Sequence, residues 1–347
     1  MQTVVTCHRY GLFEVPTRRA RHPIIYDSKG KDSNVKHRKL GKSELQVSVV
    51  GLGCNNFGFV ANMDVEASRK VVDKAIDAGI NFFDTSDSYG SSEEILGEVL
   101  GERRKKIVLA TKFGSQLDQE GRKNGASRAY IFSAIESSLR RLRTDWIDLY
   151  QLHRPDPNTP MEETLRALDD LVRQGKVRHI GCSNLSAAQL VEAHSIAEDN
   201  KLTKFVSSQD EYSLVVRDIE RELLPVVEKY GMAELPYFPL ASGLLTGKYR
   251  KGQAAPKGSR LAIKQGLADR YLNEANFEKV ERLERFAKEH GHTVLELAFS
   301  WLLARPAVAS VIAGATKPEQ VEKNAQSANW DLSREDLAVI DRITGKD

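Results

Sequence analysis

From about residue 47 to the C-terminus, short apolar or β-branched runs alternate with longer stretches of helical periodicity. This alternation is typical of βα units, which build a parallel sheet covered by helices. The predicted strands number eight, and they span residues 47–52, 81–84, 107–111, 147–152, 179–183, 205–209, 235–239 and 309–312. Because eight parallel strands close a barrel, we expect an α/β fold of the parallel (β/α)8 TIM-barrel type.

Residues that favour helix caps and turns mark the connections between these strands. The predicted helices begin after the capping residues Asp64, Ser127 and Ser186 and extend to Gly79, Leu142 and Glu198. Residues 38–46 predict a short polar hairpin before the first barrel strand, where it would cover the bottom of the barrel. Residues 242–276 are rich in glycine and longer than an ordinary connection, and loops of that length are usually functional.

The chain of 347 residues, 41% of them hydrophobic and 29% charged, has the composition of a globular protein with a sizeable core. We expect one barrel domain over residues 37–347, preceded by a basic extension over residues 1–36. This extension predicts a flexible tail, and an organelle transit peptide is the alternative. The acidic residues Glu14, Asp27 and Asp32 count against the transit peptide.

Charge and cysteine content exclude several classes of function. The net charge of +3 is spread along the chain, so no nucleic-acid partner is expected. The three cysteines lack the spacing of metal ligands, which predicts reduced thiols and no metal site. No apolar run approaches the ~20 residues needed to span a bilayer, so we expect a cytoplasmic protein without a membrane partner. The sequence predicts no particular oligomeric state.

Polar residues follow the predicted strands at the points where the strands end. Asp84, Lys112 and His153 follow the second, third and fourth strands, and Tyr89 lies five residues beyond Asp84. Any one of these would ordinarily be a helix cap or a surface residue, but the carboxyl ends of barrel strands meet in one place. Burying charged and polar groups together costs free energy of desolvation. A cluster of this kind therefore indicates a functional site. An ammonium at Lys112, paired with Asp84, would favour the phenolate of Tyr89 and so ease proton release, while His153 would orient a substrate oxygen.

The residues 81–90, Asn-Phe-Phe-Asp-Thr-Ser-Asp-Ser-Tyr-Gly, resemble the signature of the aldo-keto reductases. The spacing to Lys112 and His153 also resembles that family, as do residues 180–184, 237–249 and 312–324. The resemblance covers about residue 39 to the C-terminus. It implies a reductase that transfers a hydride from NADPH to an aldehyde or ketone, by default a small or medium aldehyde. The catalytic tetrad would be Asp84, Tyr89, Lys112 and His153, with Tyr89 as the general acid.

The resemblance also implies a cofactor site. Ser183, Asn184 and Gln209 would hold the nicotinamide carboxamide, and Tyr212 would stack on the nicotinamide ring. A loop over the pyrophosphate would contribute Leu240, Ser242, Gly243, Leu244, Lys248 and Arg260. A segment for the adenosine end and its 2′-phosphate would contribute Gly314, Thr316, Lys317, Gln320 and Asn324. Gln320 and Lys323 stand where family members often carry arginine and glutamate, which bears on the preference for NADPH over NADH.

The substrate pocket is expected in the loop after the first strand, at Cys54, Asn55 and Phe57, although Phe57 and Phe59 fit a core position equally well. Residues 231–238 are less apolar than the usual seventh strand of the family, and Phe238 replaces a smaller residue near the cofactor.

Two other functions fit the same fold. A barrel aldolase would use Lys112 to form a Schiff base, which requires a neutral, accessible lysine. The potassium-channel β-subunits share the fold and the cofactor site in an auxiliary binding role.

Overall fold

The computed structural model describes residues 35–115, 117 and 125–345. The predicted extension of residues 1–36 lies outside the described residues except for its last two, so its boundary and flexibility stay predictions. Within the described ranges, every helix is too short or too polar to cross a membrane.

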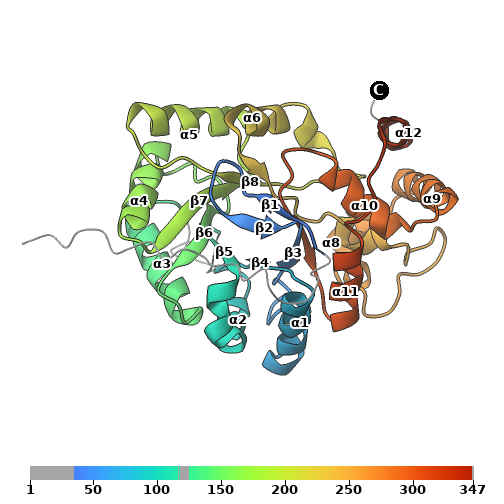
Figure 1. Cartoon of the computed structure of the whole chain (residues 1–347), viewed down its shortest axis with the longest axis horizontal. Coiled ribbons are helices and arrows are strands. Elements are labelled where there is room, and N and C mark those ends of the chain that lie inside the picture. The colour runs from blue at the N-terminus through green and yellow to red at the C-terminus, as the bar shows by residue number, and fades with distance from the viewer. Residues whose placement is uncertain (1–34, 116, 118–124, 346–347) are drawn as a thin grey trace, which may run out of the picture. The chain divides into compact units, whose positions relative to one another are not determined.

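Eight parallel strands form one curled sheet, which confirms the predicted α/β barrel fold (Figure 1). In the order β10-β3-β4-β5-β6-β7-β8-β9 around the sheet, the strands are β10 (Val311–Gly314), β3 (Val50–Gly53), β4 (Phe82–Asp84), β5 (Val108–Phe113), β6 (Ile147–Leu152), β7 (Val177–Ser183), β8 (Ser207–Gln209) and β9 (Ala233–Glu234). Glu234 donates its backbone N–H to the oxygen of Ala307 at 2.8 Å and accepts from Ala309 at 3.1 Å. These bonds join β9 to the segment that precedes β10, so the two edges of the sheet meet.

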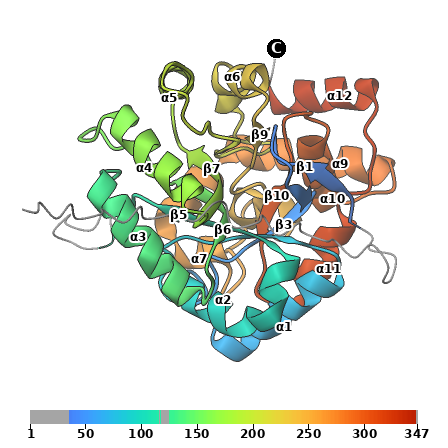
Figure 2. The same ribbon diagram turned by 60° about the vertical axis from the view of Figure 1, so that its left-hand side comes forward.

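Helices surround the strands (Figure 1). They are α1 (Val65–Asp77), α2 (Ser92–Leu100), α3 (Arg128–Arg141), α4 (Met161–Arg173), α5 (Ala187–Asp199), α6 (Leu223–Tyr230), α7 (Arg260–Ile263), α8 (Gln265–Tyr271), α9 (Glu274–Glu289), α10 (Val294–Leu303), α11 (Pro318–Gln326) and α12 (Arg334–Thr344), with 3-10 turns η1 (Gly101–Lys106), η2 (Asp218–Glu220) and η3 (Ala241–Thr246). Figure 2 shows α3, α4 and α5 side by side. In α4, Leu165, Leu168 and Leu171 recur at helical spacing, and all three are buried in the hydrophobic core.

The predicted helix caps are confirmed. Asp64 accepts from the N–H of Ala67 at 2.8 Å at the start of α1, and Ser127 accepts from Tyr130 at the start of α3. Ser186 forms a reciprocal capping box with Gln189 at the start of α5. Each cap satisfies backbone donors that have no partner within the helix, which fixes where the helix begins.

A hairpin of β1 (His37–Lys39) and β2 (Gln46–Ser48) precedes the barrel, as the sequence predicts. Arg38 donates to the backbone oxygens of Val308 and Leu303, both at 2.8 Å, so the hairpin lies at the amino ends of the strands. Gly41 has a φ of +56°, and a Cβ there would lie 2.4 Å from the oxygen of Val206. Only glycine allows this close approach, which holds the hairpin against the barrel bottom.

The largest errors among the predicted strands concern the first and the seventh. The predicted strand 47–52 is divided, because its first residues pair within the hairpin and only β3 joins the barrel. The predicted strand 235–239 is displaced, because β9 ends at Glu234. Beyond it, Leu235 and Tyr237 donate to β8 and its continuation, but the intervening Pro236 has no N–H and Phe238 turns to a φ of +49°. Regular pairing therefore stops two residues into the strand.

Candidate active site

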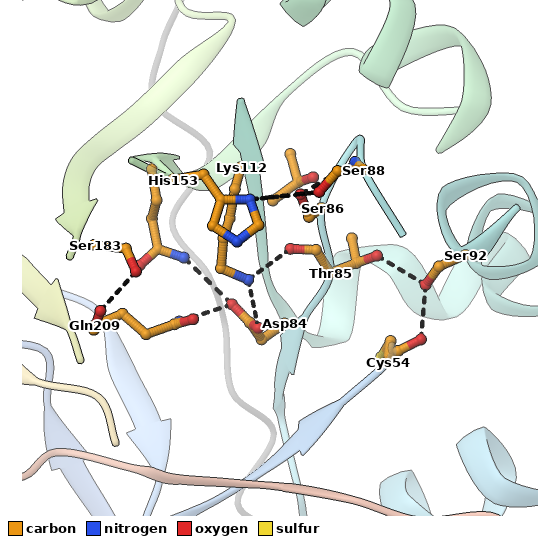
Figure 3. A network of polar contacts seen from close by, with 12 residues as sticks. Cys54, Asp84, Thr85, Ser86, Ser88, Ser92, Lys112, His153, Ser183 and Gln209 are labelled. Carbon is orange, nitrogen blue, oxygen red and sulfur yellow. Dashed lines mark hydrogen bonds and ion pairs between the residues drawn. The ribbon is translucent and has the colours of Figure 1, made fainter. Parts of the chain in front are cut away.

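The carboxyl ends of the strands surround a cavity of about 1800 Å³. Asp84, Ser183 and Gln209 are the last residues of β4, β7 and β8, and His153 directly follows β6. All four line the cavity, as does Tyr89 from the loop after β4. The parallel arrangement of the strands brings these residues together although they are distant in sequence, and Figure 3 shows Asp84, His153, Ser183 and Gln209 near one another.

A buried ion pair forms the floor of this site. Lys112 lies two residues beyond Ala110, the partner of Asp84 in the sheet, and its Nζ reaches back to Asp84 Oδ2 at 2.6 Å and the oxygen of Thr85 at 2.9 Å. Burial alone would lower the pKa of Lys112, but the charge of Asp84 and the neighbouring Tyr89 outweigh burial and raise it. Lys112 is 0% exposed and stays charged.

Two amides complete the surroundings of the Asp84 carboxylate. Gln209 and Gln151 donate to Asp84 Oδ1 at 3.0 Å and 3.3 Å, while Oδ2 accepts from Lys112. Asp84 is therefore fixed by three donors from three strands, which orients the ammonium of Lys112 beneath the cavity.

Tyr89 lies above this pair. Lys112 Nζ is 5.0 Å from the centre of the Tyr89 ring, and the ring stacks on Phe59 with a centroid separation of 5.9 Å. Burial raises the pKa of the Tyr89 phenol, and the charge of Lys112 opposes this shift. The phenol thus holds its proton at neutral pH. A Cβ on Gly90 would lie 2.5 Å from the oxygen of Gly58, so glycine is what allows the two loops to meet.

His153 stands edge-on to Tyr89, with ring centroids 5.8 Å apart. Burial, followed by the charges of Lys112 and Arg154, lowers the pKa of His153 to about 2. The imidazole is therefore neutral across the physiological range, and one ring nitrogen carries a hydrogen while the other accepts. Nδ1 lies 3.1 Å from Ser86 Oγ.

The residues that the sequence predicts to hold a carboxamide lie together at the ends of β7 and β8. Ser183 donates to the backbone oxygen of Gln209 at 2.6 Å, and Asn184 donates to Ser183 Oγ at 2.9 Å and to the oxygen of His153 at 3.0 Å. Asn184 has a φ of +60°, and Tyr237 donates to its side-chain oxygen at 2.9 Å. These bonds hold Asn184 in an otherwise unfavourable conformation at the cavity wall.

The segment after β9 also borders the cavity, which Leu240, Ser242, Gly243, Lys248 and Arg260 line. Its backbone is strained, because Phe238, Ala241 and Ser242 all have positive φ without being glycine. Such strain persists where surrounding structure enforces it and is concentrated at ligand sites. The hydroxyl of Ser242 is buried without a hydrogen-bond partner among the described residues.

The cavity is rich in cations that have no carboxylate partner within the described part of the chain. They are Arg154, Lys248, Lys257, Arg260, Lys264 and Lys323. Arg260 donates to the side-chain oxygens of Asn56 at 3.1 Å and Asn55 at 3.4 Å, and its guanidinium lies 5.8 Å from the centre of the Phe238 ring. Burial lowers the pKa of Arg260, which remains a cation because an arginine pKa is far above neutral. Uncompensated cations in a cavity favour an anionic ligand.

At the other side of the cavity, β10 and α11 contribute Gly314, Thr316, Gln320 and Asn324. Gln320 reaches back to accept from the N–H of Thr316 at 2.7 Å and from its hydroxyl at 3.1 Å. Lys323 lines the cavity on the same helix. Lys323 belongs to the last turn of α11, so this side of the cavity carries a cation that suits a phosphate.

Five predicted site residues do not line the cavity, and one of them, Lys112, is buried beneath it. Tyr212 is fully buried, its ring 5.1 Å from that of Trp301 and its hydroxyl bonded to Glu220, so it cannot stack on a ligand in the cavity. Leu244 and Phe57 belong to the buried core, and Lys317 is an exposed residue at the start of α11. Cys54 and Asn55 do line the cavity, as predicted.

Sequence reasoning also missed or left undecided several residues of the site. Phe59 is 52% exposed and lines the cavity beside Tyr89, although the sequence offered Phe57 and not Phe59 as a pocket residue. Tyr237 contributes a second phenol. Gln151 had a detectable signal, because it lies two residues before His153 on a strand and therefore shares a face with it.

A buried carboxyl beside the site predicts a pH-dependent stability. Burial, followed by the charge of Glu93, raises the pKa of Asp87 from 3.8 to about 7. The folded protein binds this proton more tightly than the unfolded chain, so stability from this site is lost as pH rises through that range. We therefore expect the free energy of unfolding of Asp87→Asn, compared with that of the parent, to rise by about 2–4 kcal/mol from about pH 5 to about pH 8. The scale is ~1.4 kcal/mol per pH unit. Urea unfolding at both pH values checks this, and an equal difference at both would contradict it.

The fold and the site define a parallel barrel with a cation-rich ligand cavity at the carboxyl ends of its strands. The chain matches the Aldo/keto reductase family over residues 49–344. It belongs to this family, which supports assignment as an oxidoreductase.

Individual relatives are similar over most of their length. The chain is 38% identical over 304 residues to a probable voltage-gated potassium channel subunit beta of Oryza sativa subsp. japonica, covering 84% of this chain and 91% of that protein. It is 37% identical over 330 residues to a putative voltage-gated potassium channel subunit beta of Schizosaccharomyces pombe, covering 89% and 93%. It is 34% identical over 323 residues to L-glyceraldehyde 3-phosphate reductase of Escherichia coli strain K12, covering 89% and 92%.

Proposed function

We propose that this protein is an NADPH-dependent reductase of aldehydes or ketones in which Tyr89 donates the proton. The observation that carries the proposal is the charged, buried Lys112–Asp84 pair beneath a phenol that faces a large cavity. A bound NADPH would supply a hydride to the carbonyl carbon.

The residues present fit this cofactor. Cations without carboxylate partners and the unpartnered hydroxyl of Ser242 match the charge and the hydrogen-bonding needs of phosphates. Lys248 and Arg260 would hold the pyrophosphate, while Thr316 and Lys323 would hold the 2′-phosphate. Ser183, Asn184 and Gln209 would hold the carboxamide, with Tyr237 in place of Tyr212 as the aromatic side chain at the wall.

The proton chemistry follows from the environments of three side chains. The Tyr89 O–H is protonated at neutral pH because burial raises its pKa. When the carbonyl carbon is reduced, its oxygen becomes an alkoxide-like base far stronger than a phenolate, so the proton of Tyr89 transfers to it. The charge of Lys112 stabilises the phenolate that remains, and Asp84 keeps Lys112 charged and in place. The neutral His153 orients the substrate oxygen by a hydrogen bond.

The aldolase alternative is disfavoured by the state of Lys112. A Schiff base requires a neutral amine that a substrate can reach, whereas Lys112 is enclosed and its pKa is raised. The auxiliary alternative has support of a different kind, because two of the relatives are described as potassium-channel β-subunits. It keeps the cofactor site but predicts binding without turnover.

The test is consumption of NADPH by the purified protein, followed by the loss of near-ultraviolet absorbance, with a panel of small and medium aldehydes. The panel includes L-glyceraldehyde 3-phosphate, because one relative is described as its reductase. We expect turnover with NADPH and slower turnover with NADH. Tight NADPH binding without turnover on any member would favour the auxiliary role, and a borohydride-trapped lysine adduct formed without NADPH would favour the aldolase.

A further inference from the structure

Ser86 connects the imidazole of His153 to a buried carboxyl outside the predicted tetrad. Ser86 Oγ lies 3.1 Å from His153 Nδ1 and 3.2 Å from Asp87 Oδ1. It also accepts from the backbone N–H of Ser88 at 3.2 Å and lies 2.9 Å from the Ser88 hydroxyl. Ser88 Oγ is farther from Nδ1, at 3.5 Å. Figure 3 shows Ser86 and Ser88 facing the same ring nitrogen.

Asp87 is set among groups that bring its titration close to neutral pH. The facing groups are Glu93 of α2, Tyr130 and Arg141 of α3, and Tyr150 of β6. Burial and then Glu93 raise the pKa of Asp87 to about 7, against the opposing effects of Ser86, Arg141 and Tyr130. A pKa of about 7 places the change in charge of Asp87 close to neutral pH.

His153 does not change charge in the same range. Lys112 and Arg154 face it, and these cations act with burial to keep the imidazole neutral. A neutral imidazole has two tautomers, with the hydrogen on Nδ1 or on Nε2. The partner of Nδ1 decides between them, because the hydrogen bond at one ring nitrogen fixes what the other can offer.

The protonation of Asp87 determines what Ser86 offers to Nδ1. A carboxylate only accepts, so an ionised Asp87 takes the single hydrogen of the Ser86 hydroxyl. Ser86 then accepts from Nδ1–H, and Nε2 is left with a lone pair. A protonated Asp87 donates to Ser86 instead, Ser86 donates to Nδ1, and the hydrogen of the ring is on Nε2. A carbonyl oxygen only accepts, so only this second tautomer can bind it.

We propose that Asp87 is a positioning residue that sets the tautomer of His153 through Ser86, so that His153 donates to a carbonyl oxygen only while Asp87 is protonated. The effect on turnover rests on the proposed reductase function, whereas the link from Asp87 to the ring tautomer does not.

Nitrogen NMR of the full-length protein labelled with ¹⁵N in its histidines tests the link without substrate or cofactor. Two-bond ¹H–¹⁵N spectra distinguish the two tautomers, and comparison with His153→Gln assigns the ring. Between about pH 5 and pH 9, we expect the parent protein to change from the Nε2–H to the Nδ1–H form with a midpoint near the pKa of Asp87, about 7. Asp87→Asn should hold one tautomer throughout, because an amide does not titrate, and Ser86→Ala should also remove the pH-dependent change.

Glu94→Gln is the matched control, because it removes an exposed carboxylate that also pairs with Arg141 but is not part of the chain of hydrogen bonds. The pH-dependent change should survive in it. A single tautomer at every pH in the parent protein, or a pH-dependent change that persists in Asp87→Asn, would overturn the proposal.

Steady-state kinetics then separates this inference from the proposed function. Across the same pH range, kcat/KM of the parent for an aldehyde should fall by about tenfold, the effect of one lost hydrogen bond. Asp87→Asn should lack this step. A pH-dependent tautomer change without any turnover would support the effect of Asp87 on His153 and contradict the reductase function. Turnover with a fixed tautomer would support the reductase function and contradict the effect of Asp87.

Discussion

Tyr89→Phe is expected to lower kcat for carbonyl reduction by about 10²–10⁴-fold, the usual contribution of a positioned proton donor. The phenylalanine ring keeps the stacking contact with Phe59 and the shape of the cavity, so only the transferable proton is lost. NADPH affinity should therefore change little. Steady-state kinetics with an aldehyde gives kcat, and titration of cofactor fluorescence gives the dissociation constant.

Tyr237→Phe is the control for this experiment. It removes the other phenol hydroxyl found at the cavity wall, which donates to Asn184 rather than facing the Lys112–Asp84 pair. We expect a smaller effect that falls mainly on cofactor affinity. Full turnover in Tyr89→Phe would rule out Tyr89 as the proton donor.

Asp84→Asn is expected to cost both activity and stability. Asp84 and Lys112 are both buried, and the substitution leaves the ammonium without a counter-charge. Removing one partner of a buried pair destabilises a protein by about 3–5 kcal/mol. The pKa of Lys112 should also fall, because burial lowers it and the opposing charge of Asp84 is gone. Urea unfolding measures the stability, and kcat falls because the phenolate of Tyr89 loses its stabilising cation.

The double variant Asp84→Asn with Lys112→Met distinguishes the two effects. Removing both charges should restore much of the lost stability, because an apolar side chain suits the buried site better than an unpaired ammonium. Activity should stay lost in both variants. Normal stability of Asp84→Asn alone would contradict the assignment of a charged Lys112.

The grouping of Asp84, Lys112 and His153 could be predicted from sequence because it depends on few facts. Each follows an apolar run, the runs alternate with helices, and the carboxyl ends of parallel strands meet. The prediction needs no side-chain detail. The same reasoning predicted the barrel and its helix caps, since the caps depend on local residue types.

Side-chain direction in the irregular segments could not be predicted. β8 ends at Gln209, and the chain beyond it is not part of a regular strand. In this segment Glu211 lines the cavity, whereas Tyr212 packs in the core beside Trp301. In the segment after β9, the positive φ at Phe238, Ala241 and Ser242 comes from tertiary packing, and none of these residue types favours it. The placement of Leu244 in the core follows from the same turn.

Whether Phe57 and Phe59 belong to the core or to the pocket was equally undetermined by sequence. Both residues occupy one loop, and the phenylalanine that packs inward is decided by how this loop meets Gly90 and Tyr89. Such contacts join segments distant in sequence, and no local pattern records them.

The measurement that tests the central claim most directly is the transfer of deuterium from NADPH labelled at the nicotinamide C4 to an aldehyde. Mass spectrometry of the alcohol product reports whether the label has moved to the former carbonyl carbon. The reductase function predicts alcohol with one deuterium from one of the two C4 positions of the nicotinamide, and a much smaller amount with Tyr89→Phe. NADPH that binds but yields no deuterated alcohol with any aldehyde would contradict it.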